Sequence, residues 1–368
     1  MFDFLNKKAR PIGLDIGHND IRMIQLADGD DDLHVVAAEK VRLDPELGDD
    51  DKKRRKFIVS AISEILVKSG FRGRNVVSCL PNEVLKIKSL RLDTTSDEQI
   101  KTLMEEELAQ KFDLDPLNDE VRYIRAGNVY HGNETKSEII FFGTEKENIV
   151  RHITLLEEAG LRPVAIDIVP LALFRTFQTS LRRQEDEQLI SLLLDVGTVF
   201  TTAIIGRGKR ITFVKQIPIA GYHFNEQVAS KLGISVNEAT MLRLKIKNSN
   251  ADAIDASTRQ TVADAMNQVI EKLVKEISLC VQYYSVTFRG ERPAEAVFAG
   301  GEAYETMLLD TLKRHLGVEI KVAQPLRGFD LTKTHLASDG KDTLCEWAVA
   351  VGLAMKGWEF SACGTKTC

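Results

Sequence analysis

The sequence predicts an α/β protein with two similar domains that face each other. One plan occurs twice, as IGLDIGHNDIRMIQL at 12–26 and SLLLDVGTVFTTAII at 191–205: an apolar strand, an Asp-x-Gly turn and a β-branched strand. Strand and helix patterns alternate along the rest of the chain, as they do in α/β proteins. The chain has 368 residues, 43% of them hydrophobic, which allows two or three domains at about 150 residues each. Because the copies lie about one domain apart, they indicate paired domains rather than a short-period array.

The elements between the two copies are predicted from periodicity and capping signals. The segment FIVSAISEILVKSG predicts a helix that ends at Ser69 and Gly70. The acidic run 49–51 and the basic run 52–56 precede it, and we interpret them as a solvated helix start. From about residue 75, strands, a helix capped by Ser96 with Gln99, and a further strand pair predict a compact βαββ insertion.

The second half of the chain continues the alternation. ENIVRHITLLEEAGL predicts a helix, and RPVAIDIVP predicts the strand that returns the chain to the first domain. After the second copy, a long core helix is expected over 258–288. AVFAGGEAYETML predicts a strand, a Gly-Gly turn and a helix. The small residues of AVAVGLAMKG predict a closely packed final helix.

Composition argues against several classes of protein. A formal charge of -5 argues against nucleic acid as a partner. No run reaches the roughly 18 to 20 apolar residues of a membrane span, and the start of the chain lacks the apolar region of a signal peptide. We therefore expect a cytoplasmic protein without direct membrane insertion. The five cysteines lack CxxC spacing, and the seven histidines are dispersed, which predicts reduced thiols and no metal site built by the protein alone.

The two Asp-x-Gly turns are the candidate chemical features. Backbone amides around the glycine can approach a phosphate, while the carboxylate can hold hydrated magnesium. Asp and Gly are also the commonest turn residues, so each copy alone is better explained as an ordinary hairpin. Together with Gly300 and Gly301, which lie between a predicted strand and helix, the two turns predict a three-sided nucleotide cradle.

These segments resemble the actin-like ATPase superfamily and, within it, the PilM family of type IV pilus assembly. The two Asp-x-Gly segments resemble its phosphate motifs, and AVFAGGEAYETML resembles its adenosine motif. RPVAIDIVPLALFR, AVAVGLAMKG and FGTEKENIVRHITLLEEAGL also resemble PilM segments, and the insertion lies where PilM and its relative FtsA carry a small subdomain. The resemblance implies an actin-like ATPase fold, with two facing RNase H-like domains and a βαββ subdomain inserted in the first.

The resemblance also gives domain boundaries. We expect the first domain to comprise 1–75, 161–188 and 342–360, the inserted subdomain 76–160, the second domain 189–341, and a tail 361–368.

The resemblance implies ATP and Mg2+ as ligands. Asp15 and Gly17 would face the phosphates, and Arg22 lies where the family has a phosphate-contacting lysine. Asp15 and Asp195 would hold Mg2+, and Asp195 would orient an attacking water. The remaining expected nucleotide-binding residues are His18, Asn19, Gly197, Thr198, Thr201, Arg243, Gly300, Gly301 and Glu302.

Several of these positions depart from the family pattern. His18, Asn19 and Asp20 replace small residues, and Glu302 replaces a third glycine. In ISVNEATMLRLK, the usual Glu and Lys that follow Ala239 are Thr240 and Arg243. Because small positioning errors strongly reduce rates, we expect ATP binding with at most slow hydrolysis.

As a function, the resemblance implies a cytoplasmic scaffold of type IV pilus assembly, peripheral to the inner membrane through its partner. That partner would be the N-terminal cytosolic tail of a PilN-like inner-membrane protein, docked near residues 75–80 and 155–165, with the pilus motor complex as a further partner. Two alternatives stay open: a cytoplasmic component of a type II secretion apparatus and a small-molecule kinase of the same superfamily. We also consider an FtsA-like membrane-tethered filament. The last needs an amphipathic C-terminal helix, which SACGTKTC cannot form.

Overall fold

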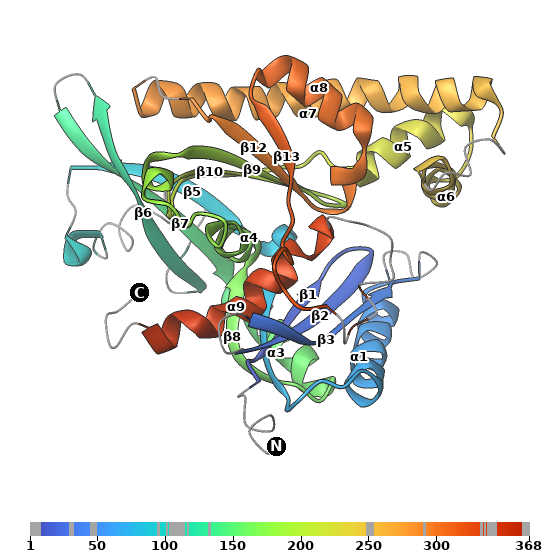
Figure 1. Cartoon of the computed structure of the whole chain (residues 1–368), viewed down its shortest axis with the longest axis horizontal. Helices are drawn as coiled ribbons and strands as arrows, with labels where there is room; N and C mark the ends of the chain where they lie inside the picture. The colour runs from blue at the N-terminus through green and yellow to red at the C-terminus, as the bar shows by residue number, and fades with distance from the viewer. Residues whose placement is uncertain are drawn as a thin grey trace. The chain divides into compact units, whose positions relative to one another are not determined.

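The computed structural model describes most of the chain, in two compact units (Figure 1). Unit 1 comprises Met1–Gly127, Lys136–Arg182 and Ala323–Cys368, and unit 2 comprises Asn128–Thr135 and Arg183–Val322. The described residues are 9–28, 33–44, 50–93, 96–100, 102, 115, 118–131, 134–247, 254–289, 292–331, 334, 336 and 344–362. The predicted tail thus lies almost wholly outside the described residues, as do Cys363 and Cys368.

Unit 1 is built on a sheet with strand order β3-β2-β1-β4-β8. β1 is antiparallel to β2 and parallel to β4, which is parallel to β8. Its elements in chain order are β1 (Ile12–Ile16), β2 (Asp20–Asp28), β3 (Leu33–Arg42), α1 (Asp51–Lys68), β4 (Asn75–Leu80), η3 (Asn82–Val84), α3 (Lys146–Glu158), β8 (Arg162–Ile168), α4 (Val169–Gln178), η8 (Cys345–Trp347) and α9 (Ala348–Ala362).

Unit 2 repeats this arrangement with strand order β11-β10-β9-β12-β13. β9 is antiparallel to β10 and parallel to β12. Both predicted Asp-x-Gly hairpins are therefore confirmed. The elements of this unit are η4 (Gln184–Gln188), β9 (Ile190–Val196), β10 (Thr201–Arg207), β11 (Arg210–Ile217), α5 (Gly221–Leu232), α6 (Val236–Lys247), α7 (Ala256–Thr287), β12 (Glu295–Ala299), η6 (Gly301–Tyr304), α8 (Thr306–Leu316) and β13 (Glu319–Val322).

A third sheet, with order β5-β7-β6, corresponds to the predicted insertion. It consists of β5 (Lys86–Leu92), β6 (Asp119–His131) and β7 (Glu134–Glu145). The predicted cap is present, because the backbone N–H of Gln99 donates to Ser96 Oγ at 3.2 Å; most of the helix it would start, including Leu103 and Phe112, lies outside the described residues. β4 joins the first sheet and α3 packs on the first core, so the domain boundaries stay predictions.

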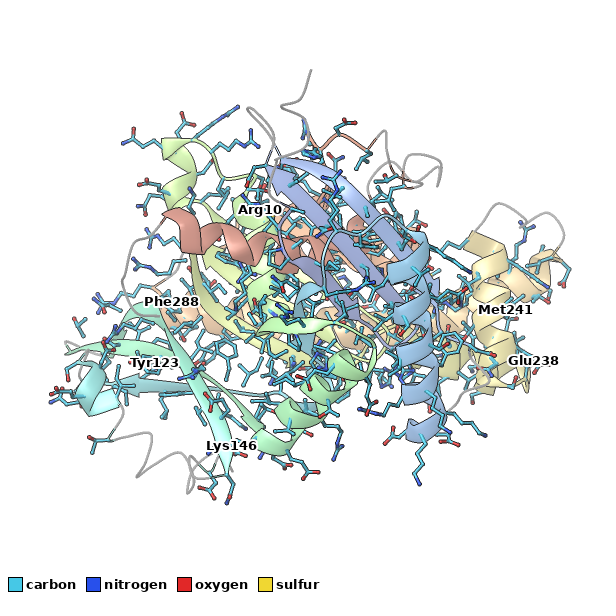
Figure 2. All side chains as sticks on the ribbon, turned by 90° about the horizontal axis from the view of Figure 1, so that it is seen from below. Arg10, Tyr123, Lys146, Glu238, Met241 and Phe288 are labelled. Carbon is cyan, nitrogen blue, oxygen red and sulfur yellow. The ribbon has the colours of Figure 1, made fainter. Side chains whose placement is uncertain are left out.

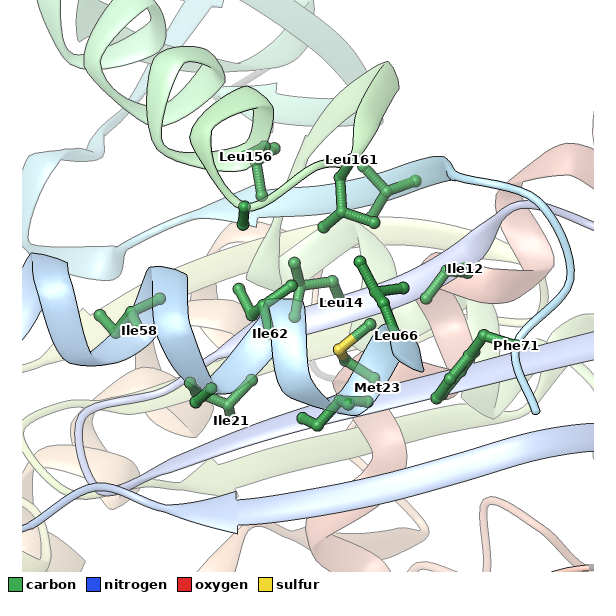
Figure 3. Close-up of a cluster of buried hydrophobic side chains, with 14 of the residues drawn as sticks. Ile12, Leu14, Ile21, Met23, Ile58, Ile62, Leu66, Phe71, Leu156 and Leu161 are labelled. Carbon is green, nitrogen blue, oxygen red and sulfur yellow. The ribbon is translucent and has the colours of Figure 1, made fainter. Parts of the chain in front are cut away.

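The core of unit 1 lies between α1 and the sheet (Figure 3). Asp50 caps α1 by accepting from the N–H groups of Lys52 and Lys53 at 3.1 Å. The helix then buries the stripe predicted from its periodicity, and packs it against strand and α3 residues that include Leu14, Ile21, Met23 and Leu156. The stripe consists of Ile58, Ile62, Ile65 and Leu66.

The final helix contacts its neighbours backbone to backbone. A Cβ added to Gly13 of β1 would lie 2.2 Å from the Ala350 oxygen of α9, and one added to Gly352 would lie 1.9 Å from the Ala172 oxygen of α4. A buried carboxylate reinforces this junction, since Asp167 of β8 lies 3.1 Å from Arg175 Nη2 and 3.1 Å from Lys356 Nζ. The predicted close packing of α9 is confirmed, and it requires glycine at both crossing points.

Two expectations from composition can be compared with the described part of the chain. No helix in the described ranges is long and apolar enough to cross a membrane. Cys79, Cys280 and Cys345 are buried and are not in disulfides.

A buried histidine joins α3 to the sheet. His152 is 7% exposed, and its Nε2 lies 3.0 Å from Ser78 Oγ. The Ser78 hydroxyl donates its proton to the Leu14 oxygen at 2.9 Å, so Oγ must accept from Nε2–H of the imidazole. Burial lowers the pKa of His152 to about 4, which keeps the ring neutral at neutral pH.

This histidine predicts a loss of stability in mild acid. The folded pKa lies below the ordinary value of 6.5, so the unfolded chain binds the proton first as the pH falls from 6.5 toward 4. We expect the free energy of unfolding to fall by about 2 kcal/mol between pH 7.5 and 5.0 through this group. Urea denaturation at both pH values measures it, with His152→Asn as the comparison. An equal loss in the wild type and the variant would contradict the assignment.

Candidate functional site

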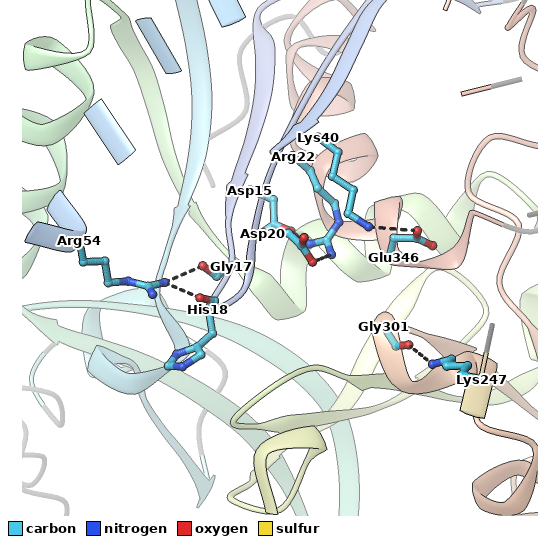
Figure 4. Close-up of polar contacts among 10 residues, drawn as sticks. All are labelled: Asp15, Gly17, His18, Asp20, Arg22, Lys40, Arg54, Lys247, Gly301 and Glu346. Atoms are coloured by element: carbon cyan, nitrogen blue, oxygen red, sulfur yellow. Dashed lines mark hydrogen bonds and ion pairs between the residues drawn. The ribbon is translucent and has the colours of Figure 1, made fainter. Parts of the chain in front are cut away.

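The carbonyl groups of residues 17–20, in the turn between β1 and β2, all accept hydrogen bonds, and Figure 4 shows those of Gly17 and His18. The N–H of Gly17 donates to the Asp20 oxygen at 2.9 Å, which closes the turn. Arg54 of α1 reaches across with Nη2 and donates to the Gly17 oxygen at 2.9 Å and the His18 oxygen at 2.8 Å. The Asn19 oxygen accepts from the N–H of Leu43 at 2.8 Å. The carbonyl groups of residues 17–20 are therefore all satisfied within the protein.

A row of charges crosses the strands beside this turn. Asp15 and Arg22 are paired in the register of β1 and β2, and Asp15 Oδ2 lies 3.3 Å from Arg22 Nη1. Arg22 Nη2 also lies 3.0 Å from Asp20 Oδ2. Burial raises the pKa of Asp15, the charge and hydrogen bond of Arg22 act to lower it, and the charge of Asp20 adds to the rise. Arg22, expected to contact phosphate, is thus already shared between two carboxylates.

The row continues to the last helix. Arg22 is paired with Lys40 in the register of β2 and β3, and Lys40 Nζ lies 3.7 Å from Glu346 Oε1, just before α9 (Figure 4). Glu346 is 7% exposed, so this pair is shielded from solvent on the side of the acid. The three acids of this row, Asp15, Asp20 and Glu346, therefore share two cations, Arg22 and Lys40.

The turn between β9 and β10 in unit 2 has the same closure. The N–H of Gly197 donates to the Phe200 oxygen at 3.2 Å. Here the two following carbonyls are bound by the start of α5: the Gly197 oxygen accepts from Gly221 N–H at 3.1 Å, and the Thr198 oxygen from Tyr222 N–H at 2.6 Å. The hydroxyl of Thr201 is buried and donates to the Ile219 oxygen at 2.7 Å. Thr201 therefore anchors the strand that follows the turn.

The Gly-Gly turn lies directly beside the second aspartate. β12 is parallel to β9 with Ala299 opposite Asp195, so Gly300 follows at the level of the second turn. Gly300 has φ 88°, and a Cβ there would lie 2.6 Å from Asp195 Oδ1, so only glycine leaves room for the carboxylate. Lys247 of α6 holds the other side by donating from Nζ to the Gly301 oxygen at 3.0 Å (Figure 4).

Two residues that depart from the family pattern bind each other. Arg243 Nη2 lies 2.7 Å from Glu302 Oε2, and its Nη1 donates to Asn225 Oδ1 at 2.6 Å. The guanidinium also lies over the Phe224 ring, 5.2 Å from its centroid. The Glu302 carboxylate packs on the bare Cα of Gly221, where a Cβ would lie 2.5 Å from Oε1. This network of Arg243, Asn225 and Glu302 ties α6 and α5 to the Gly-Gly turn.

The structure brings the predicted residues together in two groups, one in each unit. Asp15, Gly17, His18, Asn19 and Arg22 surround the first turn. In unit 2, one group surrounds the second turn and the Gly-Gly turn: Asp195, Gly197, Thr198, Thr201, Arg243, Gly300, Gly301 and Glu302.

Three contributors were missed from the sequence: Arg54, Asn225 and Lys247. Arg54 belongs to the basic run interpreted as solvated, yet it lies four residues before Ile58. Helical periodicity therefore places it on the inner face of α1, and this signal could have identified it. On α6, Glu238 and Met241 lie on the outer side (Figure 2), whereas Arg243 is buried.

The residues of each turn fit a phosphate group. Each turn presents peptide N–H groups near a glycine, which is a geometry that binds anions. Within the described ranges, no group of three or more His, Cys, Asp or Glu side chains could hold a metal ion. Mg2+ needs no such cage, because it is held by one or two carboxylates together with phosphate oxygens and water. Asp15 and Asp195 are suited to that role.

Comparisons with known proteins place the chain in a family. The model of the family described as type IV pilus assembly protein PilM matches residues 13–358. Among solved structures, a PilM-PilN type IV pilus biogenesis complex is similar with a TM-score of 0.76 and 19% identity, over 95% of this chain and 98% of that chain. The ethanolamine utilization protein EutJ from Carboxydothermus hydrogenoformans is similar with a TM-score of 0.54 and 15% identity, over 95% of this chain and 90% of that chain. With the repeated sheet order, these similarities show the expected actin-like ATPase fold.

The charge row predicts a pH-dependent effect of Arg22→Met. Removing the guanidinium leaves the Asp15 carboxylate buried beside Asp20, so the folded pKa of Asp15 rises further. The variant should be less stable than the wild type by about 3 kcal/mol at pH 7.5, and the deficit should shrink as the pH falls and Asp15 takes up its proton. Urea denaturation at pH 7.5 and 4.5 measures this, with the exposed Arg42→Met as control. A deficit that is the same at both pH values would refute the explanation.

Proposed function

Because the chain belongs to the PilM family of type IV pilus assembly proteins, we propose that it is a nucleotide-binding scaffold of pilus assembly whose ligands are ATP and Mg2+. The family match favours pilus assembly over the type II secretion and kinase alternatives.

One observation carries the nucleotide proposal: the two Asp-x-Gly turns have the same hydrogen-bonding pattern, although different groups donate to their carbonyls. Each turn follows an aspartate at the end of a β-strand, closes by a glycine N–H, and has its next two carbonyls held by donors. An ordinary hairpin turn needs no external donors for those carbonyls. Their occurrence at both Asp-x-Gly sequences supports a shared ligand chemistry, in which amides bind phosphate.

The proposed roles follow from position. Asp15, Gly17, His18, Asn19 and Arg22 would act on the phosphates from the first turn. From unit 2, Asp195, Gly197 and Thr198 would act on the phosphates, with Thr201 supporting their turn. Gly300, Gly301, Arg243 and Glu302 would border the adenosine. Mg2+ would be held through Asp15 and Asp195, where it would neutralise phosphate charge.

Hydrolysis is proposed to be slow at most. Asp195 is the residue that would orient an attacking water, as a hydrogen-bond acceptor. Arg22 is held by Asp15 and Asp20, and Arg243 is held by Glu302 and Asn225. Neither cation is available to stabilise developing charge on phosphate without breaking these contacts, which supports a binding role above a catalytic one.

We further propose that a PilN-like cytosolic tail is the partner that holds the protein at the inner membrane. The similarity to a PilM-PilN complex supports this choice. The expected docking region near 75–80 and 155–165 contains β8, the edge strand of the first sheet. Val164 is the extra residue of a bulge in β8 and is 49% exposed; Val150 of α3, which precedes the expected region in sequence, is 61% exposed. Such exposed apolar side chains suit an extended apolar peptide.

Calorimetric titration with MgATP tests the nucleotide proposal. We expect saturable binding that falls at least roughly 10-fold in Asp195→Ala and Asp195→Asn, because a magnesium-binding carboxylate is lost. Asp264→Ala, on an exposed position of α7 in the same unit, should bind like the wild type. No heat of binding at millimolar MgATP by the folded wild-type protein would rule out the nucleotide role.

A peptide-binding assay tests the partner. With a synthetic peptide of the N-terminal tail of the cognate inner-membrane protein, Val150→Glu and Val164→Glu should weaken binding roughly 10-fold or more, since each places a charge in an apolar contact. Val67→Glu on α1, where valine is 81% exposed, should leave the affinity unchanged. Equal affinity in all variants would show that the tail binds elsewhere.

A further inference from the structure

The two Asp-x-Gly turns differ in the groups that bind their carbonyl oxygens. In unit 2 the holders are the backbone N–H groups of Gly221 and Tyr222 at the start of α5. In unit 1 one side chain, Arg54, holds both corresponding carbonyls, those of Gly17 and His18. The guanidinium of Arg54 thus binds the carbonyl groups of the first turn, as the backbone N–H groups at the start of α5 bind those of the second.

This contact decides which way the turn presents its amides. In a trans peptide the C=O of one residue and the N–H of the next point in opposite directions. By fixing the carbonyls of Gly17 and His18, Arg54 directs the N–H groups of His18 and Asn19 to the side away from α1. In unit 2 the start of α5 fixes the carbonyls of Gly197 and Thr198. This directs the N–H groups of Thr198 and Val199 away from α5.

The surroundings of Arg54 suit a fixed charge rather than a mobile surface arginine. Its backbone N–H donates to the Asp50 oxygen at 2.9 Å, within the first turn of α1. Burial lowers the pKa of Arg54, while the nearby charges of Glu83 and Asp51 act to raise it. Arginine stays protonated in proteins, so the side chain brings a permanent positive charge to the back of the turn.

We propose that Arg54 is a positioning residue that holds the first turn in its anion-binding conformation, as the start of α5 holds the second. The inference rests on the proposed binding of ATP and adds to it a residue that touches no ligand. It assigns α1 a role in the site: the helix that covers the core of unit 1 also sets the geometry of the turn.

The test compares Arg54→Met with Arg54→Lys and Arg55→Met. Arg55 is the neighbouring residue and pairs instead with Glu158 at 2.9 Å, which makes it a matched control on the same helix. Each full-length protein is titrated with MgATP and with inorganic tripolyphosphate. Thermal melting and hydrogen exchange of the peptide covering residues 15–21 are measured in parallel.

We expect Arg54→Met to bind both MgATP and tripolyphosphate roughly 10- to 100-fold more weakly, from the loss of two charge-assisted hydrogen bonds. Faster exchange in residues 15–21 should accompany the loss, Arg54→Lys should recover part of the affinity, and Arg55→Met should match the wild type. Unchanged affinity in Arg54→Met would overturn this inference alone. Absence of binding by the wild type would overturn the proposed nucleotide role and this inference together.

Discussion

The contact of α9 with β1 is the constraint on which unit 1 depends. Gly13 and Gly352 remove the side chains at the two crossing points, so the helix backbone lies directly on the strand and on α4. β1 lies within its sheet between β2 and β4, and it carries Asp15 at its end. The helix therefore fixes, through backbone packing, the strand from which the first turn begins. The Lys40 to Glu346 pair joins β3 to the residues just before this helix, and the Asp167 to Lys356 pair joins β8 to the helix itself.

Two units with one sheet order have reached the same turn geometry by different routes. In unit 2 the chain leaves β11 and begins α5 directly against the second turn, so backbone N–H groups of α5 can donate to the carbonyls of that turn. In unit 1 the chain after β3 reaches α1 through a longer connection, and a long side chain spans the remaining distance to the first turn. A duplicated fold can thus conserve the position of backbone donors and acceptors while the groups that fix them differ.

The local features of this fold were predictable from the sequence, and the long-range pairs were not. Hairpins at Asp15 and Asp195 follow from alternation around a glycine, and the buried face of α1 follows from the spacing of Ile58 and Ile62. These signals are local because they come from the directions in which successive side chains point along a strand or a helix. The pairing of Arg243 with Glu302 joins residues far apart in sequence, and no periodicity encodes it. Arg54 is intermediate, since its face was predictable but its acceptors, Gly17 and His18, were not.

The charged departures from the family pattern are compensated within the unit where each occurs. Asp20 adds a carboxylate beside the first turn, and Arg22 binds it together with Asp15. Glu302 adds another at the Gly-Gly turn, and Arg243 binds it. Each added acid is bound by a cation, which offsets part of the negative charge that would repel phosphate. As a result, the guanidinium groups of Arg22 and Arg243 are bound to carboxylates of the protein. Recognition of an anion would then depend mainly on backbone amides, whose direction is set by Arg54 in one unit and by α5 in the other.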